Sequence, residues 1–121
     1  MSRVQQARHL QDRTKKFALR VVKGVSRLPK SEEARVLSRQ LLRSGTSVAA
    51  NYRAACRSRS SADFISKISI VVEEADETLF WLELLIEANI VSAKIVKPLA
   101  AECEELVKIF SASLATAKAN R

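Results

Sequence analysis

Helix-breaking residues are scarce in this sequence, and their scarcity constrains the fold more than any other feature. Only two glycines and two prolines occur among 121 residues. Tight turns and β-hairpins depend on these residue types, because their backbone preferences match turn conformations. We therefore expect long helices with short connections. The length is typical of one domain and is sufficient to bury a core without a disulfide or a metal ion.

Four segments carry apolar residues at intervals of three and four, which is the spacing of an amphipathic helix. Pro29 ends the first segment, because proline disfavours helix in the residue before it. Ser31 is a suitable N-cap for the second segment. Short connections make consecutive helices antiparallel. The sequence predicts one all-α domain, an up-and-down antiparallel four-helix bundle, with helices over residues 3–28, 31–59, 61–88 and 92–117.

Pro98 interrupts the fourth segment, where a proline removes a backbone donor and crowds the preceding turn. Two arrangements are compatible with it. Residues 92–97 form a separate turn and Pro98 lies near the first helical position, or a single helix kinks at the proline. We prefer the first arrangement, because proline is common in the first turn of a helix.

Charge is distributed unevenly along the chain. Residues 1–60 hold 15 Lys/Arg and 3 Asp/Glu, which gives +12. Residues 61–121 hold 6 Lys/Arg and 10 Asp/Glu, which gives −4 and a net charge of +8 for the chain. Either the acidic half neutralises the basic half, within the bundle or between subunits, or the basic half binds a polyanion. The two interpretations are compatible, since eight charges remain after full pairing.

Basic residues form a stripe on each of the first two helices, opposite the apolar positions. Few acids relieve their mutual repulsion, so a neighbouring subunit or a nucleic acid backbone should compensate them. No aromatic residues alternate with them to stack on bases, and binding would therefore be backbone-driven and weakly sequence-specific. The candidate nucleic-acid-binding residues are Arg13, Lys16, Arg20, Lys23 and Arg27 on the first helix and Arg35, Arg39, Arg43, Arg53 and Arg57 on the second.

The third helix is too apolar for a single core stripe. A second apolar flank either widens the contact with bundle neighbours or forms a subunit interface, and we prefer the interface because aromatic residues are enriched there. The residues of this flank are Ile70, Phe80, Trp81 and Leu84.

Small residues are concentrated in the middle of the second helix. A glycine inside a helix costs about 1 kcal/mol relative to alanine, so its presence suggests the close approach of another helix. Asn51 flanks the core positions and could form a hydrogen bond across helices. The residues expected at this close packing are Ser44, Gly45, Ser47 and Asn51.

The sequence lacks recognisable catalytic and cofactor-binding motifs. His9 is the single histidine and has no zinc-ligand spacing to Cys56 or Cys103. The two glycines cannot form a phosphate-binding loop. We therefore expect no enzymatic activity, no metal and no cofactor. No signal peptide or membrane-spanning run is evident, which predicts a cytoplasmic protein with no membrane partner and with free thiols.

Several motifs resemble the 23S rRNA-intervening sequence proteins, over roughly residues 10–115. The resemblance implies a bundle that assembles as a homopentamer in the bacterial cytosol, without established enzymatic activity. Some members are encoded within insertions of large-subunit rRNA genes, which motivates a link to RNA. Many members have Glu where this chain has Ala54, so a role of that side chain does not carry over. The matching motifs are Leu28-Pro29-Lys30, the run from Arg43 to Tyr52, Arg57-Ser58-Arg59-Ser60, Ala62-Asp63-Phe64, the run from Glu73 to Thr78, and the run from Trp81 to Leu85.

These observations predict a non-enzymatic, basic, homo-oligomeric scaffold or accessory protein that binds RNA or another nucleic acid through backbone electrostatics. The alternative is a self-assembling protein–protein interaction module with no nucleic acid partner.

Overall fold

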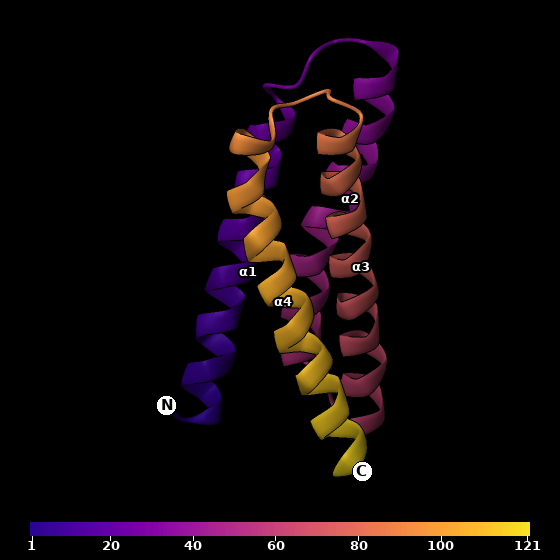
Figure 1. Cartoon of the computed structure of the whole chain (residues 1–121). Coiled ribbons are helices and arrows are strands. Elements are labelled where there is room, and N and C mark those ends of the chain that lie inside the picture. The colour runs from indigo at the N-terminus through magenta and orange to yellow at the C-terminus, as the bar shows by residue number, and fades with distance from the viewer.

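The computed structural model describes residues 1–121 as four helices without β-strands (Figure 1). Consecutive helices run in opposite directions, as expected for an up-and-down bundle (Figure 1). The predicted all-α four-helix fold is therefore confirmed. The helices are α1 (Arg3–Val25), α2 (Glu32–Cys56), α3 (Ser61–Glu87) and α4 (Ala93–Ala119). None of them combines the length and hydropathy needed to cross a membrane.

Serine side chains cap the first three helices. Ser2 accepts a hydrogen bond from the backbone N–H of Gln5, and the Gln5 side chain accepts one from the backbone N–H of Ser2. Ser31 and Ser60 accept equivalent bonds at the starts of α2 and α3. These bonds satisfy donors that a helix leaves free in its first turn. The first two helices end three residues earlier than the sequence predicted, and turn-type hydrogen bonds follow each end.

Pro98 lies within α4, so the preferred arrangement of a separate turn over residues 92–97 is wrong. The helix begins at Ala93 and places Pro98 in its second turn. Only the bond from position 98 to the Lys94 carbonyl is lost there, because proline lacks an N–H. Two amides of the first turn, those of Ile95 and Val96, donate to the Ser92 carbonyl. A single missing bond near the helix start is thus tolerated.

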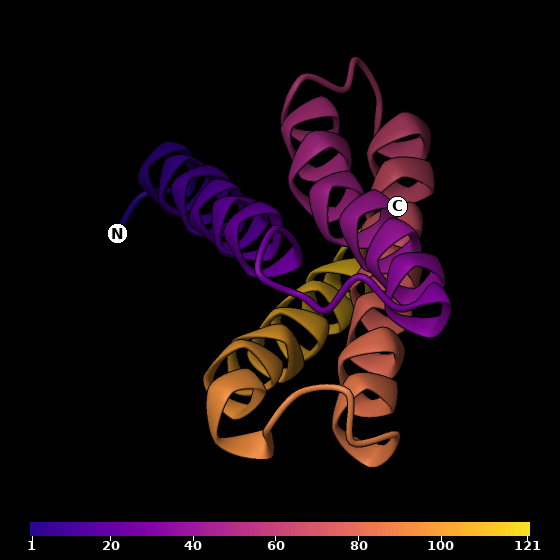
Figure 2. The same cartoon turned by 90° about the horizontal axis from the view of Figure 1, so that it is seen from above.

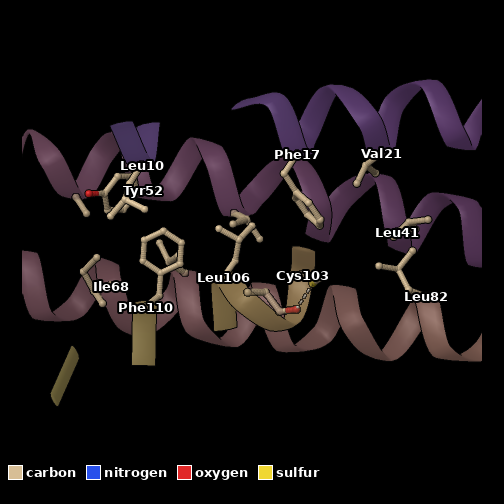
Figure 3. Close-up of a cluster of buried hydrophobic side chains, with 14 of the residues drawn as sticks. Leu10, Phe17, Val21, Leu41, Tyr52, Ile68, Leu82, Cys103, Leu106 and Phe110 are labelled. Atoms are coloured by element: carbon tan, nitrogen blue, oxygen red, sulfur yellow. Dashed lines mark hydrogen bonds between the residues drawn. The ribbon is translucent and has the colours of Figure 1, made fainter. Parts of the chain in front are cut away.

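The core is a continuous apolar cluster to which all four helices contribute (Figure 3). The rings of Tyr52 and Phe110 pack with their centroids 4.8 Å apart. The buried Cys103 Sγ donates to the Ala75 carbonyl over 3.2 Å, shown as a dashed line in Figure 3. Cys103 and the half-buried Cys56 are both free thiols, as predicted.

Gly45 permits the close packing of α2 on α1. A Cβ added at Gly45 would lie 2.9 Å from Cγ2 and 3.0 Å from Cγ1 of Val21, a fully buried side chain. On its other side α2 meets α3, where the buried Thr78 hydroxyl lies 2.9 Å from the Ser44 hydroxyl. Ser44 and Gly45 therefore lie where α2 meets its two neighbouring helices.

Asn51 does not bridge two helices, and that hypothesis is wrong. Its side-chain amide donates to the carbonyl of Ser47 over 2.9 Å, within α2 itself. It also lies 3.3 Å from the Ser47 hydroxyl. Both residues are half-buried. A local bond of this kind is always within reach of an amide four residues further along a helix.

The helices do not pack evenly around the bundle. Extensive contacts join α1 to α2, α2 to α3 and α3 to α4, whereas α1 meets α4 over a short stretch only. Figure 2 shows α1 standing apart from the other three helices toward its N-terminus. The bundle is therefore open at the end where α1 begins and α4 ends (Figure 1).

Candidate nucleic-acid interface

The basic stripe of α1 is exposed except at its first member. Arg13 forms a two-pronged ion pair with Glu102 of α4, at 2.8 Å from Nε and 2.7 Å from Nη2. The hydrogen bonds from Arg13, and its charge, hold the pKa of Glu102 below its ordinary value, and the charge of Arg20 adds to this. Arg13 thus faces α4, whereas the sequence placed the whole stripe opposite the core. The exposed members without an ion pair are Lys16, Arg20, Lys23 and Arg27.

The basic stripe of α2 also loses one member to an internal ion pair. Arg43 reaches Glu74 of α3 over 3.1 Å and forms a second pair with Glu77. The bond to Glu77 is the main reason that the pKa of Arg43 is raised. Sequence reasoning missed these acids because they lie on another helix. The exposed members without an ion pair are Arg35, Arg39, Arg53 and Arg57.

Charge is segregated across the bundle. Helix α1 has seven Lys/Arg and one Asp, a charge of +6, and α3 has one Lys and seven Asp/Glu, a charge of −6. These two helices lie diagonally, since each packs against α2 and α4 but not against the other. One side of the molecule is therefore strongly basic and the opposite side strongly acidic.

The apolar flank of α3 divides into two parts. Ile70 and Phe80 are exposed, with 39% and 51% of their surface accessible. Trp81 packs against the core cluster and meets Phe80 edge-on at 5.0 Å. The interpretation of a widened bundle contact therefore applies to Trp81. Leu84 is half-buried and lies outside the core cluster.

A groove of about 1120 Å³ lies between the start of α1 and the end of α4, and we call it the end groove. Residues of α2 and α3, among them Tyr52 and Phe64, form its floor. The exposed Arg3 and Arg59 and the half-buried Cys56 also line it. Sequence reasoning missed this groove, because it assumed that all four helices pack closely. The available signal was the row of small residues near the end of the chain, such as Ala112 and Ala117.

The thiols are poorly suited to nucleophilic chemistry. Burial, reinforced by nearby carboxylates such as Asp76, raises the pKa of Cys103 to about 12. Burial also raises the pKa of Cys56. A thiol reacts as its thiolate, so a raised pKa suppresses reactivity at neutral pH. No group of three or more His, Cys, Asp or Glu side chains is arranged to hold a metal ion.

Comparisons with known proteins agree with this fold. The family model of the 23S rRNA-intervening sequence protein matches residues 8–112. A crystal structure from Bacteroides thetaiotaomicron VPI-5482, of a protein with unknown function from the S23 ribosomal protein family, is similar at 35% identity with a TM-score of 0.83. The match covers 90% of this chain and 97% of that chain. No curated protein matches significantly. The chain belongs to the 23S rRNA-intervening sequence protein family.

Proposed function

We propose that this protein is a non-enzymatic, self-associating scaffold that binds RNA through the phosphate backbone. The observation that carries the proposal is the set of eight exposed Lys and Arg side chains of the two stripes that have no ion-pair partner. Six of them lie on α1 and α2, and Arg27 and Arg57 lie just past the ends of these helices. Only Arg13 and Arg43 of the two stripes are neutralised within the chain.

Phosphate groups suit these stripes better than base edges do. Long cationic side chains on a helix face reach phosphates without reading sequence. Phe17 and Tyr52, the aromatic residues of α1 and α2, are buried in the core and offer no surface for base stacking. Binding should therefore be independent of sequence and sensitive to salt.

Self-association is the second part of the proposal, and we expect five subunits. The exposed Ile70 and Phe80 supply an apolar patch on α3. The charges of α1 and α3 are opposite, so α1 of one copy attracts α3 of the next. A contact between two different faces repeats in one direction and closes into a ring when the rotation allows. This arrangement also supports the alternative function, a self-assembling module with no nucleic acid partner.

The variant Arg20→Gln with Lys23→Gln separates the two functions. If the stripe binds RNA, filter binding with an RNA of arbitrary sequence should weaken at least fivefold, while light scattering shows unchanged assembly. Lys94→Gln with Lys97→Gln is the matched control, since both lysines are exposed and lie on α4. If neighbouring subunits cover the stripe, wild type fails to bind RNA near 0.1 M salt and the Arg20/Lys23 variant loses assembly.

Light scattering on the wild type tests the subunit number. The mass should be near five times 13.4 kDa. Ile70→Glu with Phe80→Glu should weaken assembly and leave helical circular dichroism intact, because both side chains are exposed. Trp81 is unsuitable for this test, since it packs against the core. A monomer at micromolar concentration would contradict the proposal of self-association.

A further inference from the structure

We propose that the end groove is a docking site for a short acidic amphipathic helix of a partner protein. The proposal does not depend on RNA binding, because the groove uses none of the eight exposed stripe residues.

The shape of the groove fits a helix. Its two walls are helices themselves, residues 3–10 of α1 and residues 109–119 of α4. At about 1.5 Å per residue these walls extend roughly 10 and 15 Å, which corresponds to two or three turns of an inserted helix. The side chains of the α4 wall are mainly small, among them Ala112, Ser113 and Ala117. An inserted helix can therefore approach the α4 backbone closely.

The lining determines the chemistry of the occupant. Half of the 18 lining residues are hydrophobic and none is acidic. The apolar lining is accessible to a ligand in part: Phe64 and Ile109 are half-buried and extend the core to the surface. Arg3 and Arg59 are exposed and have no ion-pair partner. A partner helix with one apolar stripe would bury the apolar lining of the groove. Carboxylates beside that stripe would neutralise Arg3 and Arg59.

Other occupants fit less well. A nucleobase would need an aromatic face, but Tyr52 is 6% exposed and its ring packs on Phe110. Arg3 and Arg59 also offer fewer contacts to a nucleic acid backbone than the four unpaired cations of either basic stripe do. A second copy would have to insert its acidic helix α3, which is packed on both sides by α2 and α4. The surface that α3 presents together with these neighbours is broader than a single helix and fits the groove less well.

The test uses a displayed library of 14-residue helical peptides selected on the full chain. Enriched peptides should carry an apolar stripe with spacing 3, 4 and 7 and a net negative charge. Ala112→Trp should fill the groove and weaken binding at least tenfold, and so should Arg3→Glu with Arg59→Glu. The matched controls Ala101→Trp and Lys94→Glu with Lys97→Glu should bind as wild type, since these exposed residues lie outside the groove.

Alkylation of Cys56 at alkaline pH locates the bound peptide. Cys103 is fully buried, so the reaction reports on the thiol that lines the groove. Saturating peptide should slow the alkylation of Cys56 at least tenfold. The proposal is overturned if no peptide is enriched, if enriched peptides are basic, or if Ala112→Trp binds them as wild type does. It is also overturned if single-stranded RNA protects Cys56 from alkylation as strongly as the peptide does. The same holds if raising the protein concentration alone gives this protection.

Discussion

The middle of the bundle and its open end differ in how closely their helices pack. In the middle, α2 lies between α1 and α3, and Gly45 and Ser44 bring the three helices together. At the open end α1 leaves α4, and a groove of about 1120 Å³ replaces direct contact. In the middle, Arg13 and Arg43 pair with carboxylates of neighbouring helices, whereas Arg3 and Arg59 at the open end have no ion pair.

This difference indicates where stability and where binding reside. Arg43 in the middle joins α2 to two carboxylates of α3, and the buried Thr78 hydroxyl lies against that of Ser44. Substitutions there should destabilise the bundle. Substitutions at the open end should leave the fold intact and change what the protein binds.

Leucine substitutions at the two regions should give the largest contrast. Gly45→Leu places a side chain against the fully buried Val21, and we expect it to lower the free energy of unfolding by about 1–3 kcal/mol. Ala112→Leu in the end groove should change it by less than about 0.5 kcal/mol, because Ala112 is exposed. Urea denaturation measures both. Equal effects at the two sites would remove the distinction between them.

Alanine substitutions at the two glycines sharpen this result. Replacing glycine by alanine inside a helix normally stabilises by up to about 1 kcal/mol. Gly24→Ala should show this gain, since nothing lies within 4 Å of the added Cβ. At Gly45 the contact with Val21 should cancel or reverse the gain. A gain at Gly45 as large as at Gly24 would show that α1 adjusts without cost.

The buried hydroxyls of the middle predict a smaller effect. Ser44→Ala should cost about 0.5–1.5 kcal/mol, the usual net worth of one hydrogen bond. Thr78 keeps its bond to the Glu74 carbonyl at 2.7 Å and is not left unsatisfied. Thermal melts of Ser44→Ala and of the exposed control Ser111→Ala should differ by this amount. No difference would mean that the Ser44 hydroxyl contributes only volume.

The smallest effect concerns the ion pair between Arg13 of α1 and Glu102 of α4. The pKa of Glu102 is lowered from 4.5 by Arg13, so the pair stabilises the folded state above that pH and is lost as the pH falls below it. Glu102→Gln should cost up to about 1 kcal/mol at pH 7, and the difference from wild type should shrink steadily as the pH falls below 4.5. A difference that persists in acid would assign the effect to packing.

The fold was largely predictable from the sequence, because it follows from local periodicity and from the scarcity of breakers. Ser31, Pro29 and the apolar spacing located the second helix within a few residues at each end. Pro98 was misjudged, since its effect depends on how far into the helix it lies. The helix tolerates it in the second turn, and the sequence does not specify where that turn begins.

The candidate site was less predictable, because ion pairs join residues far apart in the chain. Nothing in the spacing of Arg13 indicates Glu102, 89 positions later. The end groove depends on the divergence of α1 from α4, which arises from packing and leaves no periodic signal. Periodicity identified the stripes, and only the structure separated the neutralised cations from the free ones.

The salt dependence of RNA binding tests the central claim most directly. The four exposed cations of the first stripe, Lys16, Arg20, Lys23 and Arg27, should displace counterions. The slope of log affinity against log salt should therefore be about −3 for single strands. Filter binding should give this slope for two RNAs of unrelated sequence, with similar affinities. A slope near zero, or affinities that differ a hundredfold between the two RNAs, would contradict binding through the phosphate backbone.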